Sequence, residues 1–521
     1  MPFRIREILL VSSAYDAFVL EEDGSLTDRL FYEYSELSLS WAPRITHARS
    51  GRRALELLGE RRFDLVLTVV RVGDVDAGEL SRLVRERVPD ITIALLTFDE
   101  HDLAHFPNAR VPSTIDRVFQ WTGDASVFIA AIKSIEDQRN ADHDCAAAGV
   151  QVILVVEDRV RSYSSFLALL YPELLAQSGS LIGEGLNDLH RLMRMRARPK
   201  IVLATTFDEG VQLFERYRPY ICAVMSDIRM PHGGEMDPRG GFALAERIRA
   251  ERSDLPILFQ SAEPDGERPA RAIGAWFLNK NAPDFPDQVR WFLQEALGFG
   301  DFVFRLPDRT EVARARDVYE MEQALRSVPR ESVAFHAAHN HFSVWLRARC
   351  LFPLADLVRP RRLADFADVE ELRTDLLRIL HEARLNEQEG VITDLAARHT
   401  GPENRFVRVG RGSVGGKGRA VAFVSAQIVR HGLLQRYKDL QIRVPKTVVL
   451  GTDAFETFMD RVDRAGLTSL TDEGVTERML AASLPDEVMR DLHKAWINLK
   501  GPLAVRSSSL LEDSRFQPFA G

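Results

Sequence analysis

Acidic side chains follow the ends of two apolar runs in the second quarter of the chain. The run Val152–Val156 leads into Glu157 and Asp158, and the run Ile221–Met225 leads through a serine into Asp227. Three carboxylates in one place repel one another unless a hard cation bridges them, and Mg²⁺ takes such oxygen ligands. These acids therefore predict a magnesium site, provided that the fold brings the two run ends together.

Two further runs end in a hydroxyl and a lysine. Ser261 closely follows Ile257–Phe259, and Lys280 closely follows Ala275–Leu278, which contains Phe277. A lysine ammonium is a compact point charge that suits a phosphoryl oxygen. Together with the acids, these residues predict a site for an incoming phosphoryl group.

The elements that must position these side chains are parallel strands. Continuous apolar runs that alternate with helical patterns favour a parallel sheet covered on both faces. In a doubly wound sheet, ligands bind at the carboxyl edge of the strands, where all of these residues would gather. Residues 150–300 are therefore predicted to form a doubly wound, flavodoxin-like α/β domain.

This constellation resembles the receiver domain of two-component response regulators. The resemblance implies that Asp227 is the phosphoacceptor, with a histidine kinase or a phosphotransfer protein as its phosphodonor. It assigns the remaining roles as follows: Glu157 and Asp158 hold Mg²⁺ with Asp227, Lys280 pairs with the phosphoryl group, Ser261 is the switch hydroxyl and Phe277 is the switch aromatic.

Two departures from the receiver pattern are visible. Asn281 follows Lys280 where receivers usually have proline, often with a cis bond. The loop from His232 to Arg239 is also longer than usual. An unrelated doubly wound domain with acids on its loops is the alternative interpretation.

Residues 1–140 show the same alternation of apolar runs and helical patterns, but different residues stand at the ends of the runs. Apolar runs at Ile8–Val11, Leu65–Val70 and Ile91–Leu96 predict strands. Aligning the strand patterns puts Ser12 and Ser13 in place of the acidic pair, Val69 in place of the aspartate and Trp121 in place of the lysine, while Thr97 keeps a hydroxyl. We expect a degenerate receiver used for packing or for dimerisation; an unrelated α/β domain is the alternative. The polar segment Glu136–Gly149 is predicted to be a linker.

Residues 301–400 are predicted to form a helical connector, because they are rich in Ala, Leu, Arg and Glu and contain few glycines. His336, His339 and His341 lie close together in it. A phospho-accepting or metal-binding histidine is one interpretation of this cluster. A polar helix face with no chemical role is the other.

Residues 406–418 form a glycine loop that fits two common phosphate-binding motifs poorly. Gly410, Gly412 and Gly415 satisfy G-x-G-x-x-G, but that motif expects an acid about 20 residues on, and the next strand ends only near Asp453. A P-loop needs a glycine where Arg411 stands, and a serine or threonine in place of Gly418.

The last nineteen residues add a second phosphate motif. A predicted strand, Leu503–Val505, delivers Arg506 into a serine run. The planar fork of arginine pairs bidentately with phosphoryl oxygens. An acidic pair and a Phe-Ala-Gly turn, Phe519–Gly521, follow.

These two motifs together resemble the ATP-binding domain of the phosphoenolpyruvate synthase and pyruvate phosphate dikinase family. The resemblance implies that residues 401–521 are the start of an ATP-grasp-like domain. It assigns ATP binding to Gly415, Gly416, Lys417, Gly418, Arg506, Ser507, Glu512 and Asp513. The carrier histidine and the pyruvate-binding barrel of the family would lie beyond Gly521.

Composition narrows the class of protein. The 521 residues include 68 Lys and Arg against 76 Asp and Glu, a formal net charge of −8, which argues against a nucleic-acid partner. Cys145, Cys222 and Cys350 form no Cys-x-x-Cys pair, as in proteins of a reducing cytosol. No apolar run approaches the roughly 18 residues of a membrane helix. We expect a cytoplasmic protein with no membrane partner.

The sequence thus predicts an ATP-dependent phosphotransferase related to phosphoenolpyruvate synthase and regulated by phosphorylation of Asp227, with Mg²⁺ and ATP as cofactors. Pyruvate would be reached through the missing C-terminal domains, and the fragment alone is expected to be inactive. A non-catalytic signalling adaptor that binds nucleotide is the alternative. A DNA-binding response regulator is disfavoured, because neither a helix-turn-helix nor a basic patch is visible.

Overall fold

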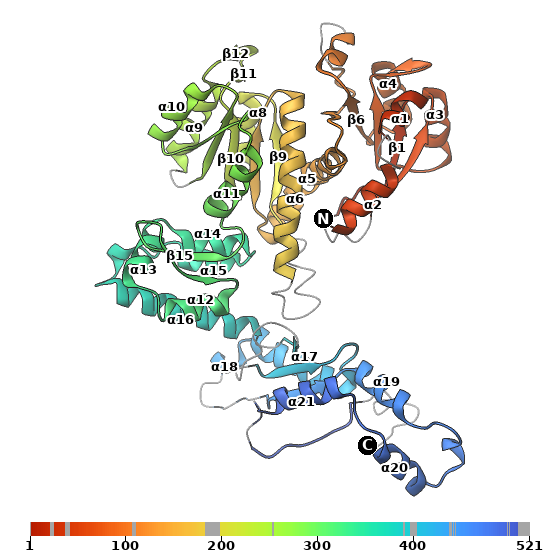
Figure 1. The fold of residues 1–521 in the computed structure, drawn as a ribbon, viewed down its shortest axis with the longest axis vertical. Helices are drawn as coiled ribbons and strands as arrows, with labels where there is room; N and C mark the ends of the chain where they lie inside the picture. The colour runs from red at the N-terminus through yellow and green to blue at the C-terminus, as the bar shows by residue number, and fades with distance from the viewer. Residues whose placement is uncertain are drawn as a thin grey trace. The chain divides into compact units, whose positions relative to one another are not determined.

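A computed structural model describes residues 2–20, 26–36, 42–106, 111–182, 198–252, 255–388, 391–395, 404–436, 440, 442, 444–497, 499 and 501–508 (Figure 1). The chain divides into two compact units. The first contains Met1–Ser180 and Met195–Gly300, and the second contains Asp301–Leu346 and Pro353–Gly521.

The first unit begins with a five-stranded parallel sheet in the order β2-β1-β3-β6-β7. Its strands are β1 (Glu7–Val11), β2 (Arg44–Ala48), β3 (Leu65–Val69), β6 (Thr92–Thr97) and β7 (Arg117–Gln120), with a small hairpin of β4 (Arg71–Val72) and β5 (Val75–Asp76). Its helices are α1 (Ala14–Leu20), α2 (Leu26–Glu36), α3 (Gly51–Glu60), α4 (Ala77–Arg87) and α5 (Ser126–Ala148).

A second sheet of the same kind follows, in the order β14-β13-β10-β8-β9. Its strands are β8 (Val152–Val156), β9 (Lys200–Ala204), β10 (Ile221–Asp227), β13 (Ile257–Ser261) and β14 (Trp276–Asn279), with a hairpin of β11 (Met230–His232) and β12 (Glu235–Asp237). Its helices are α6 (Val160–Ile182), α8 (Phe207–Tyr217), α9 (Gly240–Glu251), α10 (Glu267–Ala272) and α11 (Phe285–Leu297).

Both sheets have the doubly wound order 2-1-3-4-5 once the small hairpins are set aside, which is the flavodoxin-like order. Every residue of β3, β8, β9 and β13 is buried, as expected for strands covered on both faces. The predicted α/β fold class is therefore confirmed. The acid-bearing strands β8 and β10 are neighbours in the second sheet.

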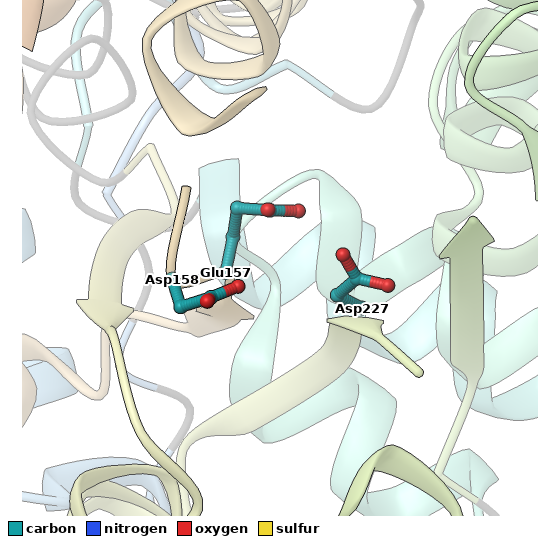
Figure 2. Close-up of side chains that lie close together, drawn as sticks. All are labelled: Glu157, Asp158 and Asp227. Carbon is teal, nitrogen blue, oxygen red and sulfur yellow. The ribbon is translucent and has the colours of Figure 1, made fainter. Parts of the chain in front are cut away.

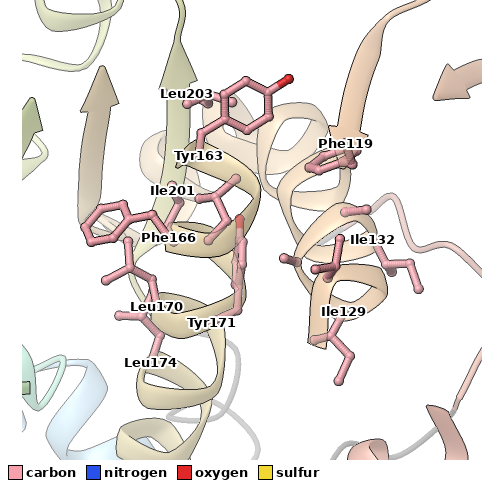
Figure 3. Packing of buried hydrophobic residues seen from close by; sticks show 14 of the residues in the cluster. Phe119, Ile129, Ile132, Tyr163, Phe166, Leu170, Tyr171, Leu174, Ile201 and Leu203 are labelled. Carbon is pink, nitrogen blue, oxygen red and sulfur yellow. The ribbon is translucent and has the colours of Figure 1, made fainter. Parts of the chain in front are cut away.

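The two sheets share one hydrophobic cluster built around α5 and α6. Figure 3 shows Tyr163, Phe166, Leu170 and Tyr171 of α6 beside Ile129 and Ile132 of α5 and Phe119 of β7. Ile201 and Leu203 of β9 belong to the same cluster. The two domains are thus packed against each other within the first unit.

The predicted linker at Glu136–Gly149 is wrong. All but the last of these residues form the second half of α5, which ends at Ala148. Its polar side chains have buried partners: Asp137 accepts hydrogen bonds from the Arg198 guanidinium (2.7 and 2.8 Å), the Tyr171 hydroxyl (3.1 Å) and the Ile201 N–H (3.1 Å). A charge taken out of water needs such partners, so polarity here reflects an interface and not a loop.

The second unit begins with a β-hairpin, β15 (Phe302–Arg305) and β16 (Glu311–Ala315). The helices α12 (Val318–Leu325), α13 (Arg330–Ala338), α14 (His341–Ala348), α15 (Phe352–Val358) and α16 (Val369–Gln388) follow, the last residues of α14 and the first of α15 falling in the first unit. The expectation of a helical connector over residues 301–400 is wrong at Phe302–Arg305 and at Glu311–Ala315. Its helix-favouring composition is overridden by pairing with β15, where Phe302 and Phe304 are both buried.

The C-terminal part has a parallel sheet of β17 (Thr393–Asp394), β18 (Phe406–Val409) and β19 (Thr447–Leu450). Its helices are α17 (Gly415–Arg430), α18 (Leu433–Arg436), α19 (Thr452–Arg461), α20 (Asp472–Ala481) and α21 (Asp486–Ile497). Short 3₁₀ helices elsewhere in the chain are Glu100–His105, Pro264–Gly266, Leu363–Asp365 and Leu467–Ser469. The strand predicted at Leu503–Val505 is wrong: these residues pair with no neighbour in the described chain, and the Val505 side chain is almost fully exposed. No helix among the described residues is long and apolar enough to cross a membrane.

Removal of the Asp137 carboxylate should destabilise the first unit strongly. In Asp137→Ala, the buried Arg198 and Lys200 would lose a partner, and the free energy of unfolding measured in urea should fall by about 3–5 kcal/mol. Asp142→Ala is the matched control on the same helix, since the Asp142–Arg216 pair is more than half exposed and should contribute about 0–1 kcal/mol. Equal effects of the two substitutions would contradict a structural role for the buried network.

The buried Asp137 carboxylate also predicts that the stability of the first unit depends on pH. Burial alone would raise the pKa of Asp137, but the charges of Arg198 and Lys200 and the hydrogen bonds outweigh it and hold this pKa below its ordinary value. The contribution of Asp137 to stability is therefore complete above the unfolded pKa of about 4 and is lost as the pH falls toward the lower folded pKa. Asp137→Ala should show a smaller loss of stability between pH 5 and pH 3 than the parent, by urea unfolding.

Candidate functional site

The three predicted acids meet at the carboxyl edge of the second sheet. Glu157 and Asp158 follow β8, and Asp227 ends the adjacent strand β10. One carboxylate oxygen of each lies within 4.8 Å of the others, and Figure 2 shows the three side chains converging. Glu157 and Asp227 are buried, and Asp158 is half-buried. Oxygen ligands so arranged suit a hard divalent cation such as Mg²⁺.

Lys280 is the cation among these acids. Its Nζ donates to Glu157 Oε2 at 2.5 Å and to Asp227 Oδ2 at 2.6 Å. Burial raises the pKa of Glu157, and the negative charge of Asp227 adds to this effect, whereas Lys280 opposes it. Burial also raises the pKa of Asp158. The acids thus form a site that is short of positive charge, which fits the binding of a metal ion.

Asp227 is held by the backbone that follows it. Its Oδ1 accepts from the N–H of Ile228 at 2.6 Å, and Oδ2 faces Lys280. A Cβ added at Gly241 would lie 2.3 Å from the Asp227 carbonyl oxygen, so the start of α9 approaches this loop as closely as only glycine permits. The Asp227 carboxylate is therefore fixed in direction.

The two remaining residues of the predicted site come from β13 and β14. Ser261 ends β13, and its carbonyl accepts the N–H of Lys280 at 2.9 Å. Its hydroxyl accepts the N–H of Glu263 at 3.1 Å. Phe277 is half-buried on β14 and pairs in register with Phe259 of β13. Both lie on the strands that carry the site.

Two features beside the site were missed or only partly anticipated. Arg229 and Glu263 form an exposed ion pair at 3.4 Å between the loops that follow β10 and β13. The long loop after Pro231 forms the β11–β12 hairpin, where the Gly233 N–H donates to Asp208 and the His232 ring lies 4.0 Å from that of Phe207. Loop length was the sequence signal for the hairpin, while the ion pair left none.

The strand register of the first sheet shows which of its residues stand at the positions of the site residues of the second sheet. Val11 pairs with Thr68 as Val156 pairs with Ser226, so the next residues, Ser12 and Val69, correspond to Glu157 and Asp227. The backbone N–H of Trp121 donates to the Thr97 carbonyl, as the backbone N–H of Lys280 donates to the Ser261 carbonyl. This edge therefore carries neither a carboxylate at the phosphoacceptor position nor a lysine.

The histidine cluster is engaged in contacts of its own. His336 is buried, and its Nε2 accepts the Arg305 N–H at 2.8 Å. The proton of the neutral ring must then sit on Nδ1, which lies 2.9 Å from His341 Nδ1. His339 is exposed, and its Nδ1 lies 2.8 Å from the Phe335 carbonyl oxygen. Both nitrogens of His336 are occupied, which favours the structural interpretation.

The glycine loop is hydrogen-bonded to Ser508. The Ser508 carbonyl accepts the N–H of Gly416 at 3.1 Å, and its hydroxyl accepts the N–H of Gly418 at 2.9 Å. A Cβ at Gly415, where φ is +72°, would lie 1.5 Å from the Ser508 carbonyl oxygen. Two predicted ATP-binding regions, 415–418 and 506–507, are thus adjacent at the start of α17.

The sequence predicts Ser507 as an ATP-binding residue, and the structure adds a contact of the next residue, Ser508, with the loop. Nothing in a serine run tells which hydroxyl will bond to the loop. Arg506 is exposed and lies two residues before this contact, and Lys417 is half-buried within the loop. The predicted residues Glu512 and Asp513 and the turn Phe519–Gly521 lie outside the described residues.

Comparison with protein families gives one match. Residues 411–521 match the family described as "Pyruvate phosphate dikinase, AMP/ATP-binding domain". The predicted family resemblance of the C-terminal segment is therefore confirmed. No curated protein matches the chain.

Solved structures similar to the N-terminal part include receiver proteins. The signal receiver domain of an HD domain-containing protein from Pseudomonas fluorescens Pf-5 is 22% identical, over 27% of this chain and 94% of that one, with a TM-score of 0.20. The response regulator TrrA from Thermotoga maritima, in complex with Mg²⁺ and BeF, is 17% identical over 25% and 99%, with a TM-score of 0.19. A probable response regulator/GGDEF domain protein is 16% identical over 56% and 98%, with a TM-score of 0.24. At these scores, the fold assignment rests on the strand order.

His336 should remain neutral across the physiological pH range. Burial lowers its pKa to about 3, and the neighbouring His341 and Arg305 add to the shift. An unfolded histidine titrates near pH 6.5, so this contribution to stability is complete above that pH and declines by up to about 1.4 kcal/mol per pH unit below it. In an NMR titration from pH 8 to 5, the ring signals of His336 should not move. A midpoint near 6.5 would contradict the buried, hydrogen-bonded ring.

Proposed function

We propose that this chain is the phosphorylation-regulated part of an ATP-dependent phosphotransferase related to phosphoenolpyruvate synthase. Asp227 would receive a phosphoryl group, and residues 411–521 would contribute to nucleotide binding. The observation that carries the proposal is the convergence of three carboxylates at the carboxyl edge of the second sheet, two of them paired with Lys280. The family match of the C-terminal segment supports the nucleotide-binding half.

The proposed reaction is transfer of a phosphoryl group to an aspartate. An oxygen of the Asp227 carboxylate forms the new bond to phosphorus, while the bond from phosphorus to the donor breaks and its electron pair leaves with the donor. A phosphohistidine of a kinase or phosphotransfer protein would serve as donor, leaving a histidine. The product is an acyl phosphate on Asp227.

The residues around Asp227 would stabilise this transfer by charge. Lys280 already contacts Oδ2 of Asp227 and would pair with a phosphoryl oxygen. Glu157 and Asp158, with Asp227, are the residues that would hold Mg²⁺, which when bound would offset negative charge on the transferring group. The Ser261 hydroxyl, at the end of the neighbouring strand, would form a hydrogen bond to the phosphoryl group on Asp227. Phe277 would change position when Ser261 moves to form this bond.

The C-terminal segment would bind ATP through cations at the start of α17. Lys417 lies in the glycine loop, and Arg506 lies two residues from Ser508, which the loop holds. Both are suited to phosphate oxygens. Pyruvate as the final acceptor, a cytoplasmic location and a histidine kinase partner all belong to the same proposal.

A non-catalytic adaptor is the second candidate. In the described structure, Ser508 takes the N–H groups of Gly416 and Gly418, which a phosphate would otherwise use. An adaptor would accept phosphate at Asp227 and bind nucleotide without turnover. ATP consumption by the full-length protein distinguishes the two.

Asp227→Asn should abolish acyl-phosphate formation, because the amide is a far weaker nucleophile than the carboxylate. Labelling by a small phosphodonor such as acetyl phosphate in the presence of Mg²⁺ should fall by at least about 100-fold, as for the loss of an essential nucleophile. Asp265→Asn, an exposed acid in the loop after β13, is the control and should be labelled like the parent. Equal labelling of Asp227→Asn and the parent would sink the phosphoacceptor assignment.

Lys417→Ala and Arg506→Ala should each weaken ATP binding by about 10- to 150-fold, because a hydrogen bond to a charged phosphate oxygen is worth about 1.5–3 kcal/mol. Isothermal titration calorimetry on the full-length protein measures this affinity. Lys494→Ala, which removes an exposed cation of α21, should leave it unchanged. An affinity that none of the three variants alters would count against the nucleotide-binding assignment.

A further inference from the structure

We infer that the first domain is a positioning partner for the metal-binding acids of the second domain, and that it acts through Tyr163 and Ser164 of α6. The inference deepens the proposed function, because it rests on the Mg²⁺ site at Glu157, Asp158 and Asp227. It assigns a role to a domain whose own edge lacks the phosphoacceptor carboxylate and the lysine.

The contacts that carry the inference join α6 to the edge strand β7. Ser164 Oγ accepts the N–H of Gln120 at 3.0 Å, and the Tyr163 hydroxyl donates to the Val118 carbonyl at 2.5 Å. Tyr163 and Ser164 are both buried. An edge strand exposes backbone groups that need partners, and here two of them are taken by side chains of a helix from the other domain.

These contacts lie at the start of the helix that follows the acids. Glu157 and Asp158 directly follow β8, and α6 begins at Val160. The Tyr163 N–H donates to the Arg159 carbonyl at 3.0 Å in the first turn. A change in the position of this turn therefore moves the backbone that carries Glu157 and Asp158, although neither acid forms a described hydrogen bond to the first domain.

Aromatic packing and a second polar contact fix the helix along its length. The Tyr163 ring meets the Phe119 ring edge-on, with centroids 6.2 Å apart. Two turns further on, the Tyr171 hydroxyl donates to Asp137 of α5 at 3.1 Å. Figure 3 shows Tyr163 and Tyr171 on the side of α6 near β7 and α5. The helix is held at two levels, so the first domain sets both its position and its rotation.

A metal site depends on such supporting contacts, because its ligands must hold their geometry when the ion binds. Lys280 can follow small movements of the acids through its flexible side chain, whereas Mg²⁺ demands near-ideal octahedral geometry. Loosening the start of α6 should therefore weaken Mg²⁺ binding more than it weakens the Lys280 contacts.

The test compares Ser164→Ala and Tyr163→Phe with Ser165→Ala. The first two each remove one polar contact to β7, and Ser165 is the exposed neighbour on the same helix. The dissociation constant of Mg²⁺ is measured by isothermal titration calorimetry without phosphodonor, together with the thermal unfolding temperature. We expect Ser164→Ala and Tyr163→Phe to weaken Mg²⁺ binding by about threefold to tenfold, at or below the range known for contacts that support metal ligands. Ser165→Ala should match the parent.

Several outcomes would overturn the inference or its premise. A merely structural contact would lower the unfolding temperature of the variants and leave the Mg²⁺ dissociation constant unchanged, which overturns the positioning role. If the parent binds Mg²⁺ no better than Asp227→Asn does, both the inference and the proposed function fail. If the parent binds Mg²⁺ through Asp227 but forms no acyl phosphate, the proposed function alone fails. Tyr163→Phe keeps the ring and removes one hydroxyl, so it provides the comparison if Ser164→Ala does not fold.

Discussion

The gathering of three carboxylates at one sheet edge, two of them paired with Lys280, is the constraint on which the second domain depends. Such a cluster repels itself, and burial adds to the cost of each charge. Lys280 offsets this cost through Glu157 and Asp227. The parallel pairing of β8 with β10, and of β13 with β14, delivers all four side chains to one edge. A divalent cation would find complementary charge at this edge, and with that charge in place Lys280 could pair with a phosphoryl oxygen.

The two α/β domains share one strand order but differ in the residues at their strand ends. In the second, the strand ends carry charge; in the first, the corresponding residues Ser12, Val69 and Trp121 carry none. The first domain contributes β7 and the long, largely buried helix α5 to the hydrophobic core that the two domains share. Asp137 and its partners make this contact specific, because a misplaced helix would leave buried charges without counter-ions.

Apolar runs and the polar residues at their ends were sufficient to predict most strands of both sheets and the acidic edge of the second, whereas β2, β7 and β9 were not predicted. Local patterns could not show that Glu136–Gly149 is helical, because the partners that make its acids tolerable are distant in sequence: Arg198 lies 61 residues from Asp137. The strand at Glu311–Ala315 depends likewise on pairing with β15. The contact of Ser508 with the glycine loop joins residues that lie 90 positions apart, so no local pattern could show it.

The central claim is that the Asp227 carboxylate accepts the phosphoryl group. An acyl phosphate is reduced by borohydride to the corresponding alcohol, so an aspartyl phosphate becomes homoserine and can be located by mass spectrometry. After incubation with acetyl phosphate and Mg²⁺, the account predicts homoserine at position 227 and its loss when Mg²⁺ is chelated. Homoserine at another acid, or phosphate recovered on a histidine, would contradict it.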